Sequence, residues 1–338
     1  MTKVLTPTKT RAVASSRSRL RFAQLRDLAL IPAIIVLIIV GALASDTFLT
    51  AGNLIAVLQQ QSELSLLVLA EALILIAGKM DLSLESTIGI APALAVALVI
   101  SKEANGLGVG VPAALAIPLC LAIGALIGAL NGFLILKLGL SGFMVTLGML
   151  TMLRGIQEGL TQGKNLFEIP EAFTYLGSST WLGLPASVWV CVVVFAVAIV
   201  VLAYFRQGRS LYAIGGNAEA AKAAGIRVDR VVWTVLIIGG LLAALAGILM
   251  TGRLGSVAVA QGNGMIFTVF AATVIGGVSL DGGKGTLFGA LSGVLMLGLI
   301  ENILRLLHVN GFWIKAIYGA VIIVALVVTR VATGKKQD

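Results

Sequence analysis

The sequence predicts an all-α polytopic membrane protein with about ten transmembrane helices. Hydrophobic residues make up 59% of the 338 residues and charged residues only 12%, which is about half the charge that a soluble domain carries. A soluble protein of this length could not bury so much apolar surface in one core. The apolar runs do not alternate with a period of two residues, so we expect helices rather than barrel strands.

Ten apolar runs are bounded by charged residues, glycine or proline, as membrane-spanning helices are. Glycines interrupt the pattern around Gly78 to Glu85 and Gly276 to Gly285, which predicts broken helices at these two places. The predicted spans are residues 28–45, 54–77, 85–101, 111–136, 141–157, 187–205, 231–250, 264–280, 285–306 and 312–330.

The basic residues predict the orientation of these spans. With the N-terminus placed inside, three quarters of the 24 Lys and Arg residues fall on the inner side, which is the bias that sets topology. We therefore expect both termini in the cytoplasm. Residues 1–27 would form a disordered basic arm at an anionic inner leaflet, residues 28–330 the transmembrane domain, and residues 331–338 a cytoplasmic tail.

The composition also disfavours several classes of function. The chain has two cysteines, Cys120 and Cys191, and both lie in apolar runs, which argues against a disulfide framework or a zinc site. One histidine, His308, cannot build a histidine-rich metal or catalytic centre. The net charge is +9, but the basic residues lie where a membrane protein would place them, so nucleic acid is not an expected partner.

Two pairs of segments half a chain apart indicate an internal repeat. Residues 72–80 align with residues 246–254, and residues 141–143 align with residues 310–312 at nearly the same offset. A repeat of about five helices would be inverted in the membrane, because five is an odd number. Inverted repeats with broken helices are typical of transporters. Chance similarity among apolar helices is the alternative.

The large inner loop, residues 206–230, predicts a short helix outside the bilayer. Residues 217–224 are good helix formers, with Asn217 as an N-cap and Gly225 as a C-cap. A helix of two turns is unstable by itself, so we expect a partner to dock on it. A merely interfacial helix is the competing interpretation.

This loop resembles the coupling motif of permease subunits in binding-protein-dependent ABC importers. The resemblance rests on Glu219, Ala220 and Ala221 followed by Gly225. Four further stretches resemble the ribose-type monosaccharide permeases in the order of that family: residues 131–134, 143–149, 208–217 and 274–286.

The resemblance implies a bacterial inner-membrane permease that is one of two membrane subunits, forming a homodimer or a heterodimer. A separate ABC ATPase subunit would bind ATP and Mg²⁺ and dock on the coupling helix. A periplasmic sugar-binding protein would deliver the substrate. The chain itself would hold no cofactor and would not be an enzyme.

One segment departs from the family pattern. Where these permeases usually read Gly-Gly-Ile-Asp-Leu-Ser-Val-Gly-Ser, residues 78–86 carry the additional charges Lys79 and Glu85. We expect Asp81 and Ser83 to cap the following helix, with Lys79 as an ion-pair partner. The departure leaves the identity of the transported sugar open.

Several glycines invite a functional reading that their spacing does not support. The run from Gly282 to Thr286 lacks the first glycine and the Ser/Thr of a phosphate-binding loop, so we expect a tight inner turn and no nucleotide site. Glycines every four residues predict close helix packing; these are Gly124, Gly128 and Gly132, and Gly289 and Gly293.

Polar residues within the spans are candidates for the substrate pathway, because they are costly in lipid. Side chains that face a cavity could bind the hydroxyl groups of a neutral polyol. The candidates are Gln60, Glu63, Asn131, Thr146 and Asn302, with Glu71 and Glu301 as weaker ones. Hydrogen bonding between helices is the competing interpretation, and Glu301 lies one turn before Arg305.

The longest external loop, residues 157–186, combines acidic and aromatic side chains. This mixture suits a docking surface for a soluble partner, although an aromatic belt at the membrane interface would have the same composition.

The sequence therefore predicts a permease subunit that imports a monosaccharide or sugar alcohol. The alternatives are an ion-coupled secondary transporter, or a permease of the same superfamily for nucleosides, branched-chain amino acids or a signalling sugar derivative. An intramembrane enzyme is disfavoured by the single histidine.

Overall fold

The computed structural model describes residues 30–314, 316–320, 323 and 327, and it confirms an all-α membrane protein. The predicted arm, residues 1–27, and the predicted tail, residues 331–338, lie outside the described residues. The helices are α2 (Leu30–Ala44), α3 (Ala51–Ile76), α4 (Leu84–Val99), α5 (Ala116–Leu136) preceded by the 3-10 turn η1 (Ala113–Leu115), α6 (Gly142–Thr161), α7 (Glu171–Ser178), α8 (Ala186–Tyr204), α9 (Arg206–Gly216), α10 (Ala218–Ala223), α11 (Val228–Leu254), α12 (Met265–Ile275) and α13 (Leu287–Leu306).

Each predicted span corresponds to helical structure. Nine spans match α2 to α6, α8 and α11 to α13, and the tenth begins with the helical residues 311–314 and 316–320. By length and composition, four described helices can cross a membrane: residues 113–136, α8, α11 and α13. Helix α12 has 11 residues, about 16 Å of rise, which is about half of the bilayer core. The predicted broken helices are thus seen.

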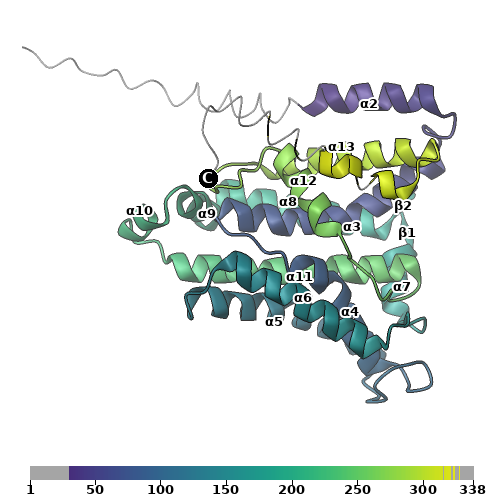
Figure 1. The fold of residues 1–338 in the computed structure, drawn as a ribbon, viewed down its shortest axis with the longest axis horizontal. Helices are drawn as coiled ribbons and strands as arrows, with labels where there is room; N and C mark the ends of the chain where they lie inside the picture. Colours follow the sequence, from purple (N-terminus) through teal and green to yellow (C-terminus); the bar gives the residue numbers. More distant parts are fainter. Residues whose placement is uncertain (1–29, 315, 321–322, 324–326, 328–338) are drawn as a thin grey trace, which may run out of the picture.

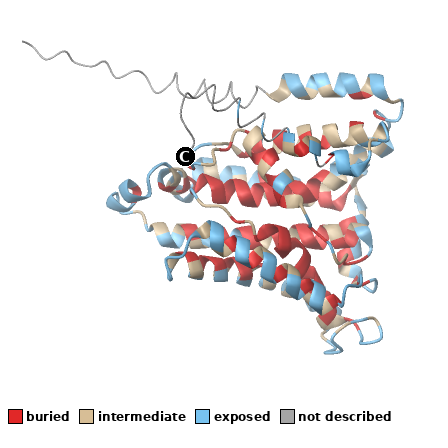
Figure 2. Ribbon diagram, in the orientation of Figure 1, coloured by how far each residue is buried: buried red, intermediate tan, exposed pale blue. Residues whose placement is uncertain are grey.

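Helices α3 and α11 form the centre of the bundle. Figure 1 shows the long helices side by side, and Figure 2 shows that buried residues concentrate on the central ones. Every residue of α3 from Gln61 to Ile76 is buried, whereas α2 and α8 expose apolar side chains such as Leu43 and Val193 that suit lipid or a partner subunit.

Glycines allow the closest helix approach, as predicted. A side chain at Gly124 or Gly128 of α5 would collide with the backbone of α11 at Gly240 or Leu236. The second glycine pair behaves in the same way, because a side chain at Gly293 of α13 would collide with the backbone of α12. Small residues in a membrane bundle serve this close packing.

The packing of the helices follows the order expected of a repeat. Helix α11 packs against α4 and α5, and α3 packs against α12 and α13. In each half a long central helix is followed by a break, a short helix and a longer one. The two central helices also pack against each other, so the halves meet at the core.

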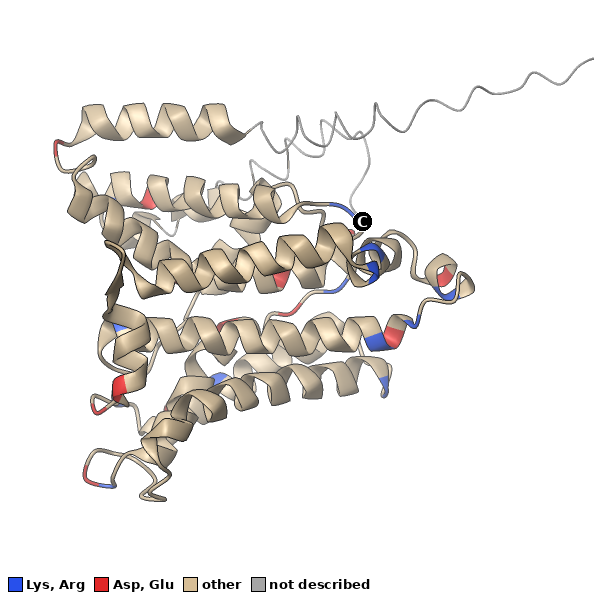
Figure 3. Cartoon of the chain, turned by 180° about the vertical axis from the view of Figure 1, so that it is seen from behind, with Lys and Arg blue, Asp and Glu red and all other residues tan. Residues whose placement is uncertain are grey.

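The two ends of the bundle differ in structure and charge. Helices α9 and α10 lie at one end, and α7 lies at the other with the antiparallel pair β1 (Thr180–Trp181) and β2 (Leu184–Pro185) (Figure 1). Basic residues gather at the α9–α10 end, and the helical lengths between the ends are almost free of charge (Figure 3). Sequence inspection did not anticipate α7, α9 or the strand pair.

Candidate functional site

A polar cavity of about 630 Å³ lies between α3, α11, the start of α12, α13, residues 309–314 and Tyr318. Two of the predicted pathway residues, Gln60 and Glu63, line it. The cavity is in the half of the bundle toward α7, because Arg253 and Arg305, near the ends of α11 and α13, also line it. It combines charged side chains with the apolar Leu64.

The charges in this cavity are paired with one another. Arg253 makes a bidentate contact with Glu63, from Nε to Oε1 at 2.6 Å and from a terminal nitrogen to Oε2 at 2.9 Å. Arg305 pairs with Glu301 one turn earlier, as the sequence suggested. The Tyr318 hydroxyl donates to the other oxygen of Glu301 at 2.7 Å. The cavity therefore offers hydrogen-bonding groups without a net charge from these four ionisable side chains.

The three other predicted pathway residues make hydrogen bonds elsewhere in the bundle. Asn302 and Asn53 exchange two amide hydrogen bonds, of 2.8 and 3.0 Å, between α13 and α3. The Thr146 hydroxyl donates to the carbonyl oxygen of Gly142 in its own helix. Asn131 is fully buried at the first helix break. None of the three lines the cavity. Glu71 is also fully buried and away from it.

The break between α3 and α4 is held by a buried polar cluster. One oxygen of Asp81 accepts hydrogen bonds from the backbone nitrogen and the hydroxyl of Ser83, at 2.9 and 2.6 Å. The Asn131 amide donates to Asp81 at 3.1 Å and to the Ser83 hydroxyl at 2.8 Å. These bonds give the polar groups of Asp81 and Ser83 hydrogen-bond partners in a turn that lies inside the bundle. Irregular backbone at membrane depth requires such partners.

Two expectations for this break are wrong. Ser83 stands at the N-cap of α4 but makes no capping bond with its side chain, because its backbone is helical (φ −69°, ψ −14°) rather than extended as a capping residue requires. Lys79 has no ion pair with Asp81 among the described residues. The amide of Asn131 and the groups of Ser83 occupy the carboxylate instead.

The second irregular segment, residues 255–264 between α11 and α12, is held by two side chains of α6 and by its own Gln261, which reaches the backbone of α4. Gln261 donates to the carbonyl oxygen of Ile88 at 2.9 Å, and Arg154 of α6 donates to the carbonyl oxygen of Gln261 at 2.9 Å. Gln157 donates to the carbonyl oxygen of Val259 at 3.0 Å. Sequence inspection did not anticipate these contacts, which join residues 102 to 173 positions apart.

Glu85, one of the two unusual charges, has a structural partner. Its Oε2 accepts a hydrogen bond of 3.1 Å from the backbone nitrogen of Ile266 in the first turn of α12. Its Oε1 lies 3.4 Å from a terminal nitrogen of Arg154. A carboxylate is favourable at a helix N-terminus, so Glu85 joins α4, α6 and α12.

The predicted two-turn helix is α10, and its ends have the expected geometry. The Asn217 side chain accepts from the backbone nitrogen of Ala220 at 2.9 Å, and Gly225 follows the helix with a φ of +82°. Glu219 and Ala220 are exposed, whereas Ala221 is buried. The exposed side is therefore free to meet another protein.

Four glycines, Gly78, Gly215, Gly282 and Gly283, join α9 to both helix breaks. We call them the glycine junction. A Cβ atom at Gly215 would collide with the carbonyl oxygen of Ile76 and the nitrogen of Gly283. The Gly283 nitrogen donates to the Ile76 oxygen at 3.0 Å. The run 282–286 is thus a turn packed against the backbone of α9 and of the first break, not a phosphate-binding loop.

Comparisons with known proteins all find permease components of transport systems. Residues 53–326 match the family described as "Branched-chain amino acid transport system / permease component". The chain is 36% identical to the ribose import permease protein RbsC of Escherichia coli (strain K12) over 300 residues, 88% of this chain and 91% of that protein. It is 33% identical to RbsC of Bacillus subtilis (strain 168) over 325 residues, 95% of this chain and 98% of that protein. It is 35% identical to the L-arabinose transport system permease protein AraH of E. coli (strain K12) over 200 residues, 59% of this chain and 61% of that protein.

Proposed function

The chain belongs to the family of branched-chain amino acid transport system permease components, and we propose that it is the membrane subunit of an ATP-driven importer for a neutral monosaccharide or sugar alcohol. Substrate crosses the bilayer without chemical change, so the chain is not itself an enzyme. A separate ABC ATPase binds ATP and Mg²⁺. A second permease subunit, identical or related, completes the path.

The charge pattern of the polar cavity supports a neutral substrate. An amino acid would need a cation for its carboxylate and an anion for its ammonium group, and both charged pairs here are already satisfied internally. The N-terminus of α12 would be an anion site, but Glu85 occupies it. Hydroxyl groups can still share the oxygens and nitrogens of Gln60 and Glu63. The relatives named for ribose and arabinose point to the same class of cargo.

The exposed face of α10 is the proposed docking site of the ATPase. Asn217 and Gly225 fix the ends of α10, and Glu219 and Ala220 present its outer side. The glycine junction links α10 to the interior of the bundle. Gly215 of α9, just before α10, contacts the end of α3 and the loop before α13. A displacement of α10 by the ATPase would therefore move both helix breaks together.

The opposite end suits a periplasmic sugar-binding protein. It exposes Phe167, Tyr175 and Leu182 and carries the acidic Glu158 and Glu168. Aromatic anchors with surrounding charge are typical of protein interfaces. The basic α9–α10 end is then cytoplasmic, the protein lies in a bacterial inner membrane, and both termini are inside.

The test is uptake of radiolabelled ribose into proteoliposomes that hold the chain, its ATPase and its binding protein. We expect uptake only when ATP, Mg²⁺ and the binding protein are all present, with unlabelled pentoses or sugar alcohols competing and leucine not competing. Uptake by the chain alone on a proton or sodium gradient would overturn the proposal in favour of a secondary transporter. Competition by leucine would overturn the choice of a neutral substrate.

A further inference from the structure

A second large cavity, of about 780 Å³, is a groove at the α9–α10 end of the bundle. Helices α8 and α11 both pack against α3, and the groove runs between them with Leu69 and Leu73 of α3 as its floor. Helix α9 and the short link from α10 to α11 close one end. The transport function proposed above does not use this groove.

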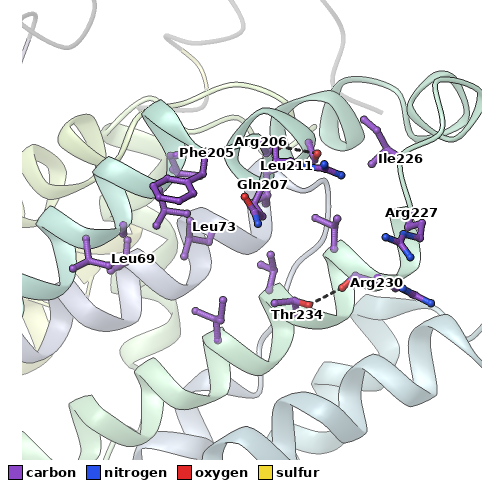
Figure 4. A pocket seen from close by; sticks show the side chains of 18 of the residues that line it. Leu69, Leu73, Phe205, Arg206, Gln207, Leu211, Ile226, Arg227, Arg230 and Thr234 are labelled. Carbon is purple, nitrogen blue, oxygen red and sulfur yellow. Dashed lines mark hydrogen bonds between the residues drawn. The ribbon is translucent and has the colours of Figure 1, made fainter.

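The two ends of the groove differ in chemistry. Aliphatic side chains line its length, including Val197 of α8 and Ile238 of α11, which remain partly exposed. Three arginines, Arg206, Arg227 and Arg230, line the end toward α9, and no described residue that lines the groove is acidic. Figure 4 shows Leu69 and Leu73 at one side and Arg227 and Arg230 at the other.

The arginines are available to an anion. Among the described residues the ion pairs join Arg154, Arg253 and Arg305 to carboxylates, and none involves a groove arginine. Arg206 opens α9, whose start has neither a side-chain cap nor an acidic residue in its first turn, whereas Asp229 lies in the first turn of α11. The free backbone N–H groups of a helix start favour negative charge, so the start of α9 and three guanidinium groups favour the same ligand.

The length of the groove identifies the rest of the ligand. From Arg230 to Leu242 along α11 the rise is about 18 Å, close to the roughly 15 Å from the head groups to the bilayer midplane. A ligand that is anionic at one end and aliphatic for the depth of one leaflet is a phospholipid. We propose that this groove binds an anionic phospholipid of the cytoplasmic leaflet, with its phosphate at Arg206, Arg227 and Arg230 and one acyl chain between α8 and α11.

Native mass spectrometry of the full chain, released from nanodiscs that contain dioleoyl phosphatidylglycerol and dioleoyl phosphatidylcholine, tests this site. We expect one phosphatidylglycerol to be retained in preference to phosphatidylcholine. The double variant Arg227→Gln/Arg230→Gln should lose about 25-fold of that preference, from about five-fold for each basic residue near the membrane surface. The matched control is Arg209→Gln, in α9 at the same end of the bundle but outside the groove, which should leave the preference unchanged.

A second pair of measurements separates a lipid from a small phosphate ligand. Val197→Trp should fill the aliphatic part of the groove and reduce retention of phosphatidylglycerol while all three arginines remain. Glycerol phosphate, which has the head group without the chains, should not displace the lipid. Arg206→Gln repeats the charge test if the double variant fails to insert. Equal losses in Arg209→Gln and the groove variants, or full displacement by glycerol phosphate, would overturn the proposal.

Discussion

Replacing Gly215 with alanine tests whether the glycine junction transmits movement from α10 to the membrane. The added methyl group would collide with the carbonyl oxygen of Ile76 and the nitrogen of Gly283, and overpacking of this kind costs about 1–3 kcal/mol. The backbone hydrogen bond from Gly283 to Ile76, 3.0 Å long, would be strained or lost, adding about 1 kcal/mol. A penalty of about 2 kcal/mol or more shifts the packed junction by about 30-fold or more.

The neighbouring Gly216 supplies the matched control for this variant. It lies in the same helix, and a Cβ atom there would have no heavy atom within 4 Å. Because alanine also favours helix, Gly216→Ala should be neutral or slightly stabilising.

The assay measures ATP-driven sugar uptake in proteoliposomes, together with the amount of ATPase bound. We expect Gly215→Ala to bind the ATPase normally while uptake falls at least ten-fold. This is about a third of the 30-fold shift calculated above for the packed junction. Equal uptake by the two glycine variants would refute the idea that this backbone contact carries the coupling.

Three further predictions concern the charged and polar pairs. Glu85→Ala should lower the free energy of unfolding by about 2 kcal/mol, because it removes the acceptor for the Ile266 nitrogen and leaves Arg154 unpaired. Glu85→Gln should cost less, and thermal unfolding in detergent measures both. Arg253→Ala, which leaves Glu63 buried without its partner, should destabilise the chain by about 3–5 kcal/mol, and Glu63→Gln in the same background should recover part of that; a variant that unfolds as readily with as without Glu63→Gln would contradict the pairing. Asn53→Ala and Asn302→Ala should each cost about 1 kcal/mol, and the double variant should cost less than their sum because the two amides bond each other; strict additivity in a double-mutant cycle would contradict this contact.

The sequence was most informative where a local pattern determines the structure. Apolar length located nine spans and the described start of the tenth. The Asn217 and Gly225 signals located α10, because a helix cap depends on residues three or four positions apart. Glycines every four residues correctly predicted close packing, since this spacing places them on one helix face.

The partners of polar side chains could not be predicted in the same way. Glu63 was expected to face a pathway, and it does line the cavity, but its partner Arg253 is 190 positions away. Asn302 bonds Asn53 across 249 positions. Such contacts depend on the vertical register of helices, which apolar sequence leaves undefined. Only the general rule that charges at membrane depth pair with one another could have suggested a search for an arginine near Glu63.

The central claim, that α10 couples this permease to an ATPase, is tested most directly by co-purification. The chain is extracted from its native membrane in a mild detergent, and the proteins that accompany it are identified by mass spectrometry. We predict an ABC ATPase with the unaltered chain and its loss with Glu219→Arg, while the control Arg209→Gln retains it and all three chains insert equally. Retention of the ATPase by Glu219→Arg at normal expression would contradict the coupling role of α10, and purification of the unaltered chain without any ATPase would contradict the importer itself.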